Sequence, residues 1–339
     1  MAHYLGSCLG TFMGTIKTCY GVGKMMQRFF FSALRIYVWA ALHIFFRRIK
    51  VSGKREVPRG AVLFTPNHQN AFMDALLVVC SSGRYTHFLA RADIFKKAWA
   101  KMLLRWINMI PIYRTRDGWQ SLTQNQKTFE ACAHLLQQEE AVVIFPEGNH
   151  GSARRLRPLS KGFTRVAFEA LRTDPNLPLY IVPVGLNYSS PTAARGDVHI
   201  VYGAALNVNQ FFKMGEQQGA QKLREVLSGA LKSIITHLPE EKDLLQEEWR
   251  GKPVDFLQPQ KVNAWIAQPT LPLPLQPSTP DLFGAMLRMP LFPLILLWRR
   301  WDAKIKDRVF VASLKFVFAW LVATVCVILL LTTLLIWLV

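Results

Sequence analysis

The first feature that points to chemistry is a histidine followed closely by an aspartate. An apolar run at 61–65 ends in a short polar turn that contains His68, and Asp74 follows at the expected start of a helix. A carboxylate that holds an imidazole fixes its tautomer and stabilises the imidazolium formed when the ring takes a proton. The pair therefore predicts a general base, although a histidine near an aspartate, taken alone, is more often a structural contact.

Two further strand ends carry residues of the kind that bind anions. Arg114 follows the apolar run at 110–113, where a guanidinium can hold a phosphate through two parallel hydrogen bonds. The run at 141–145 leads into Glu147 and Gly148, and a glycine lets backbone N–H groups approach a ligand. Taken singly, Arg114 fits a surface ion pair equally well, and the arginine-rich stretch at 154–157 fits a solvated loop.

Alternating apolar and amphipathic segments indicate the elements that must position these residues. Strands are expected at 61–65, 87–90, 110–113, 141–145, 179–186 and 198–202, and helices at 71–80, 93–107, 119–138, 161–172 and 217–237. This alternation predicts an α/β fold with a mixed, largely parallel sheet flanked by helices. In such sheets sites form at the carboxyl ends of strands, where the three polar clusters lie.

Both ends of the chain carry segments suited to a lipid bilayer. Residues 316–339 are apolar and uncharged, and a helix of that length rises about 36 Å, more than the roughly 30 Å of a bilayer core. They predict a transmembrane helix, and the basic residues at 299–308 place the preceding domain on the cytoplasmic side. Residues 29–46 are aromatic-rich and bracketed by cations, which predicts a helix lying in the interface. The interrupted stretch 282–298 fits an interfacial or re-entrant segment better than a span.

These features divide the chain into four parts. A helical membrane-interface region is expected at 1–50, followed by the α/β domain at 51–240. Residues 241–281 are rich in Pro and Gln and predict an extended linker. Residues 282–339 then form the C-terminal membrane region.

Composition narrows the class of protein. Lys and Arg number 41 against 22 Asp and Glu, a formal net charge of +19, while 51% of the residues are hydrophobic. This excludes a disordered chain, and the 5 cysteines show neither a disulfide framework nor a metal-ligand spacing. Charge and apolarity together indicate an anionic lipid surface as the partner. Nucleic acid is not expected, because no binding motif accompanies the charge.

Taken in order, the motifs resemble the glycerophospholipid acyltransferase family of PlsC type. NHQNAFMD, IPIYR, FPEG and IVPVG occur across 65–185 in that family's order. The family includes 1-acyl-sn-glycerol-3-phosphate acyltransferases, glycerol-3-phosphate acyltransferases and tafazzin-like transacylases. The resemblance implies that His68 takes the proton of an acceptor hydroxyl and that Asp74 orients the histidine.

The resemblance also assigns residues to the acceptor. It implies that Arg114 binds a phosphate, that Glu147 and Gly148 shape the acceptor pocket, and that Arg155 or Arg157 adds a further phosphate contact.

One departure from the family's pattern affects the first motif. Five residues separate His68 from Asp74, whereas the family usually has four. One additional residue within a helix would turn Asp74 by about 100° away from the histidine. We expect the turn before the helix to absorb it, so that the pairing survives.

The reaction implied by the resemblance is transfer of an acyl group from a thioester to the free hydroxyl of 1-acyl-sn-glycerol-3-phosphate, giving phosphatidic acid. Acyl-CoA or acyl carrier protein would be the donor, and the route requires neither a metal nor a cofactor. Alternatives keep the chemistry with glycerol-3-phosphate, a lyso-phospholipid or a lyso-aminolipid as acceptor, or use a phospholipid donor. A lipase or thioesterase is disfavoured because no GxSxG motif is present. The polar motif residues argue against a membrane protein without enzymatic activity. The expected location is a membrane with the site facing the cytoplasm, in a bacterium the inner membrane.

Overall fold

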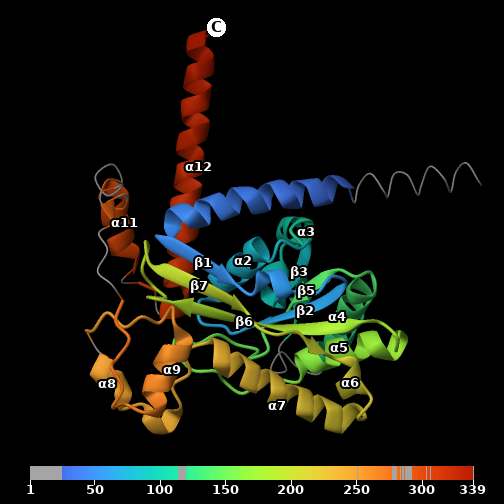
Figure 1. Cartoon of the computed structure of the whole chain (residues 1–339). Helices are drawn as coiled ribbons and strands as arrows, with labels where there is room; N and C mark the ends of the chain where they lie inside the picture. Colours follow the sequence, from blue (N-terminus) through green and yellow to red (C-terminus); the bar gives the residue numbers. More distant parts are fainter. Residues whose placement is uncertain are drawn as a thin grey trace, which may run out of the picture.

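One mixed sheet forms the centre of the molecule. The computed structural model describes residues 25–113, 120–249, 251–276, 281–282, 284, 286, 292–302, 304–305 and 307–338. Within these residues eight strands form a sheet in the order β1-β7-β6-β2-β5-β3-β4, with β8 beside β6 (Figure 1). They are β1 Arg48–Ser52, β2 Ala61–Pro66, β3 Thr86–Arg91, β4 Met109–Ile112, β5 Ala141–Val143, β6 Leu179–Tyr188, β7 Asp197–Tyr202 and β8 Leu206–Asn207. β6 runs antiparallel to β7 and β8 and the other pairs are parallel, which confirms the predicted sheet.

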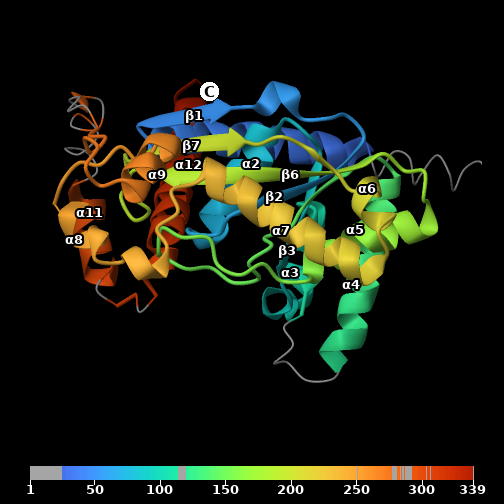
Figure 2. The same cartoon turned by 60° about the horizontal axis from the view of Figure 1, so that its bottom comes forward.

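Helices cover both faces of this sheet. They include the N-terminal helix Met25–Phe45, α2 Ala71–Ser82, α3 Ala98–Trp106, α4 Gln120–Gln137, α5 Gly162–Thr173, α6 Asn209–Phe212 and α7 Glu216–Ile234. Ala61 and Leu63 of β2 pack with α4, α5 and α7, whereas Val62 and Phe64 pack with α2 and the N-terminal helix. Figure 2 shows α7 lying across the first of these faces. Because β2 is buried on both sides, its sequence is a continuous apolar run.

Two strands and one helix differ from the sequence prediction. β1 and β8 were not expected, because β1 reads RIKVS and its two cations suggested the membrane-interface region. β1 is instead a partly exposed edge strand that pairs with β7, and Arg47 beside it donates to the buried Asp197 at 2.9 Å. The helix expected at 93–107 is a 3-10 turn, Ala92–Phe95, followed by the shorter α3.

The segment 241–281 is not the extended linker that its composition predicted. It contains α8 (Leu245–Trp249) and α9 (Pro259–Ala267), and Val262 and Trp265 are buried in a small cluster with Leu238 and Val254. Pro259 stands at the first turn of α9, where its missing N–H removes no helical hydrogen bond. This proline marks the start of a helix, so the Pro content of the segment led the sequence prediction to assign too much extended chain.

Two of the described helices are long and apolar enough to cross a membrane, the N-terminal helix and α12 (Val311–Leu338). α12 leaves the domain, and the N-terminal helix lies across it (Figure 1). They meet where the rings of Phe45 and Phe316 are 5.5 Å apart and where the hydroxyls of Tyr37 and Thr324 are 2.6 Å apart. Because the two helices cross, they cannot both run along the normal of one membrane. If one of them spans the bilayer, the other is inclined toward the membrane plane.

Part of the predicted membrane region lies outside the described residues. This holds for 1–24 of the interface region and for most of 282–291. The described end of the stretch 282–298 belongs to α11, Phe292–Asp302, which precedes α12.

Candidate active site

The histidine and aspartate of the first motif are in direct contact. His68 lies in the turn between β2 and α2, and its Nδ1 donates to Asp74 Oδ2 at 2.9 Å. Asp74 lies in the first turn of α2 and is fully buried, and its Oδ2 also accepts the N–H of Asn70 at 2.7 Å. The turn has absorbed the additional residue, since α2 begins only at Ala71, whose φ of 41° is left-handed.

The other oxygen of Asp74 accepts a hydrogen bond that sequence reasoning missed. The hydroxyl of Tyr188, at the end of β6, donates to Asp74 Oδ1 at 2.5 Å, and both side chains are fully buried. Burial and the nearby carboxylate raise the pKa of Tyr188 well above its usual value, so the phenol stays a donor. β6 lies parallel beside β2 and runs past its end, which brings Tyr188 to the same sheet edge.

Hydrogen bonding leaves one nitrogen of His68 available. Because Nδ1 donates to a carboxylate, the neutral ring carries its proton there and its lone pair on Nε2. Among the described residues Nε2 has no hydrogen-bond partner. The ring stacks on Phe145 with centroids 4.0 Å apart and meets the edge of His150 at 5.7 Å. Burial, with the neighbouring His68, lowers the pKa of His150, so that ring is neutral at pH 7.

Glu147 holds the backbone of His68 in place. Its Oε1 accepts the N–H of His68 at 2.8 Å, and its Oε2 accepts Arg157 Nε at 2.7 Å. Arg157 also donates from Nη2 to the carbonyl of His68 at 3.3 Å and from Nη1 to Asn149 Oδ1 at 2.6 Å. Gly148, at φ 73°, makes the turn that places Glu147 here. These contacts join the first and third motifs into one unit.

The arginines assigned to phosphate binding are therefore in different positions. Arg157 is engaged with protein oxygens beside His68. Arg155 pairs with Glu240 at 3.3 Å and with Asp243, so its charge is matched by carboxylates of the 3-10 turn after α7. Arg114 lies outside the described residues.

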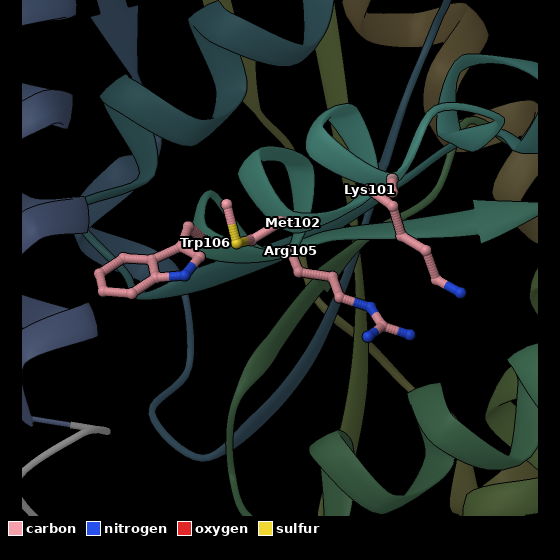
Figure 3. Close-up of a pocket in the computed structure, with 5 residues that line it drawn as sticks. Lys101, Met102, Arg105 and Trp106 are labelled. Carbon is pink, nitrogen blue, oxygen red and sulfur yellow. The ribbon is translucent and has the colours of Figure 1, made fainter.

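A cation-lined cavity at the end of β4 adds residues that sequence reasoning missed. It has a volume of about 620 Å³, and its lining includes Lys96, Lys101 and Arg105, with Tyr113 directly before Arg114. A neighbouring hollow runs along α3, and Figure 3 shows Lys101 and Arg105 on one side and Trp106 on the other. The signal in the sequence was the amphipathic pattern of α3, with cations four residues apart.

Comparison with known proteins finds acyltransferases that are similar to part of the chain. Residues 48–187 match the family model described as Acyltransferase. A glycerol-3-phosphate O-acyltransferase 2 of Saccharomyces cerevisiae is 27% identical over 120 residues, which is 34% of this chain and 16% of that protein. A probable 1-acyl-sn-glycerol-3-phosphate acyltransferase of Mycoplasma pneumoniae is 25% identical over 155 residues, 44% of this chain and 55% of that protein.

A solved structure is also similar to the chain. The 1-acyl-sn-glycerophosphate acyltransferase PlsC of Thermotoga maritima has a TM-score of 0.45 at 15% identity, covering 60% of this chain and 79% of that one. The chain spans at most about half the length of the curated relatives named above. The family match begins with β1 and contains the joined first and third motifs, so residues 48–187 are an acyltransferase domain.

Proposed function

We propose that the protein is a membrane-bound O-acyltransferase that converts 1-acyl-sn-glycerol-3-phosphate to phosphatidic acid. The observation that carries the proposal is the hydrogen bond from the partly exposed His68 to the buried Asp74 in an acyltransferase domain, with Nε2 of His68 unpartnered among the described residues. The printed name of the bacterial relative supports the choice of acceptor.

His68 acts on the acceptor hydroxyl in this reaction. Nε2 takes the hydroxyl proton while the oxygen attacks the thioester carbonyl, and Asp74 stabilises the imidazolium that forms. When the tetrahedral intermediate collapses, the C–S bond breaks and His68 returns the proton to the departing thiol. Base catalysis of this kind contributes roughly 10²–10⁴-fold, and positioning of both substrates supplies much of the rest. Acyl-CoA or acyl carrier protein is the donor, and the route uses no cofactor.

The acceptor's phosphate belongs on the cationic side of the site. Arg114 follows Tyr113 directly, and Tyr113 lines the cavity that also contains Lys96, Lys101 and Arg105. The three cations outnumber the one carboxylate of the lining, Asp93, so the cavity favours an anion such as a phosphate. Arg157 supports the site differently, by holding the turn of His68.

The membrane-facing surface comprises α12, the N-terminal helix and α3. α12 and the N-terminal helix contact each other through the pairs Phe45–Phe316 and Tyr37–Thr324. With α12 crossing the bilayer, the N-terminal helix would lie beside it in the near leaflet, in the position of an interfacial helix. Trp99 and Met102 of α3 are 62% and 63% exposed, and the ring of Trp106 contacts Phe30 of the N-terminal helix. The α/β domain then faces the cytoplasm, in a bacterium at the inner membrane.

A second candidate is the same transfer to glycerol-3-phosphate. The printed name of the yeast relative favours it. The catalytic contacts would be the same, and only the acceptor would differ.

The test is acyl transfer by the purified full-length protein in detergent, with labelled acyl-CoA and acyl carrier protein as donors. Acceptors are 1-acyl-sn-glycerol-3-phosphate, glycerol-3-phosphate and a phosphate-free lyso-lipid, offered side by side. His68→Ala should abolish transfer, whereas His134→Ala, at an exposed site on α4, should not change it. Arg114→Ala should raise the KM for the acceptor far more than that for the donor.

The outcomes separate the candidates. Label in phosphatidic acid only from the lyso-phosphate acceptor supports the proposal. Preference for glycerol-3-phosphate selects the second candidate, and preference for the phosphate-free lipid contradicts the role of Arg114. Equal transfer by wild type and His68→Ala removes His68 as the base.

A further inference from the structure

We infer that Ser313, in the C-terminal membrane helix, is a positioning residue for the His68–Asp74 pair. The inference rests on the proposed function only in taking His68 as the base. α12 is thereby part of the catalytic apparatus as well as a membrane anchor.

Ser313 inserts its hydroxyl into the turn that carries the pair. Its Oγ accepts the N–H of Met73 at 3.0 Å and donates to the carbonyl of Asn70 at 3.1 Å, and the residue is 4% exposed. Asn70 is also the residue whose N–H donates to Asp74 Oδ2. A single side chain, 240 residues from Met73 in the chain, therefore fixes both ends of the first turn of α2.

This turn needs such support because it is strained. Ala71, between the two residues that Ser313 binds, has a φ of 41°, a conformation that L-residues with a Cβ adopt only at a cost in free energy. Such strain persists where surrounding contacts hold it. The strained residue lies among the five that separate His68 from Asp74, and Ser313 supplies hydrogen bonds from outside the turn.

The same stretch of chain reaches the catalytic histidine from the other side. Phe310, three residues before Ser313, meets the ring of His150 with centroids 4.8 Å apart, and His150 meets His68 at 5.7 Å. Phe316 anchors the base of α12 on Phe45 of the N-terminal helix. The start of α12 therefore contacts the turn that carries Asp74, and Phe310, just before this helix, contacts the rings around His68.

The experiment compares Ser313→Ala with a matched variant of the same helix in the full-length protein. Thr332→Ala also removes one hydroxyl from α12, but Thr332 is exposed, and within the described part of the chain its hydroxyl donates to Leu329 O of the same helix at 2.8 Å. Ser313→Ala should lower kcat five- to thirtyfold with both KM values within twofold of wild type. Thr332→Ala should leave kcat unchanged.

Ala71→Gly supplies the second arm. Glycine adopts positive φ without the Cβ penalty, so adding it to Ser313→Ala should restore kcat at least threefold. A role in stability alone predicts a lower melting temperature with unchanged kcat, and that result overturns the inference. Absence of recovery in the double variant overturns it as well.

A spectroscopic readout separates this inference from the proposed function. The Nδ1–H signal of His68 in ¹⁵N-histidine-labelled protein, assigned by its loss in His68→Gln, reports the bond to Asp74. It should shift or broaden in Ser313→Ala and stay unchanged in Thr332→Ala. If wild type transfers no acyl group but the signal responds, the proposed function fails and the positioning role stands. An unchanged signal refutes the positioning role.

Discussion

Substituting Tyr188→Phe removes the hydroxyl that donates to Asp74 and leaves the buried ring in place. Asp74 is fully buried, and among the described residues Tyr188 is the partner of its Oδ1. The other oxygen keeps its bonds to His68 and Asn70. The variant therefore removes one hydrogen bond from a buried carboxylate, and it removes only one oxygen atom from the core.

The expected fall in kcat follows from the negative charge of Asp74, which accepts the hydrogen bond from Tyr188. A hydrogen bond to a charged group contributes about 1.5–3 kcal/mol, and about 1.4 kcal/mol corresponds to a tenfold change in rate. If the bond holds Asp74 in the geometry that stabilises the imidazolium, kcat falls about 10- to 150-fold. Both KM values should stay near those of wild type, because Tyr188 is fully buried and its hydroxyl contacts Asp74 and not the solvent-accessible surface.

Steady-state acyl transfer, with urea unfolding of the same preparations, measures both effects. Tyr202→Phe is the matched control: this tyrosine is also buried, on the neighbouring strand β7, and its hydroxyl lies 2.7 Å from the neutral Ser81. The control should lose about 0.5–1.5 kcal/mol of unfolding free energy with unchanged kcat. A Tyr188→Phe enzyme with kcat within twofold of wild type would refute the reasoning, whatever its stability.

Three further predictions address other parts of the molecule. Glu147→Gln removes the carboxylate that accepts hydrogen bonds from Arg157, so urea unfolding should show a free energy of unfolding lower by about 1.5–3 kcal/mol. An unchanged free energy of unfolding would contradict the role of Glu147 in joining the first and third motifs. Burial lowers the pKa of His199, so the folded protein binds fewer protons than the unfolded chain. The free energy of unfolding should therefore fall as the pH drops below about 6.5 toward the pKa of the folded protein, by at most about 1.4 kcal/mol per pH unit. His199→Gln should flatten this slope in melting curves recorded between pH 5 and pH 8, and an equal slope would remove the histidine as its cause. A nitroxide at Met102→Cys on α3 should be more accessible to oxygen than to a water-soluble nickel chelate in liposomes, and one at Lys127→Cys on α4 should show the reverse; equal behaviour would argue against a membrane-facing α3.

The sequence predicted best those parts of the site that depend on local order. The ends of β2 and β5 follow from short apolar runs, His68 and Glu147 lie in the turns after them, and Asp74 lies in the first turn of the helix after β2. The parallel pairing of β2 with β5 then brings these residues together. Local spacing and one rule of sheet topology were sufficient for this part.

Contacts between distant segments could not be predicted in this way. Tyr188 meets Asp74 because β6 extends past the predicted end at 186, and strand ends are set by pairing as well as by the strand's own sequence. Ser313 is one hydroxyl near an apolar run, and nothing in its neighbourhood distinguishes it from Thr332. Arg155 and Arg157 are alike as sequence, yet one pairs with Asp243 and the other with Glu147.

The crossing of the N-terminal helix and α12 has a consequence for the lipid around the protein. A helix of 21 residues is about 31 Å long and about 10 Å wide, so lying in the interface it occupies about 300 Å² of the near leaflet. In the proposed arrangement α12 is, among the described helices, the one that also enters the far leaflet. The described helices would then displace more lipid from the near leaflet than from the far one. Insertion would be easier where the near leaflet curves outward, which would tie the position of the protein in a membrane to local curvature.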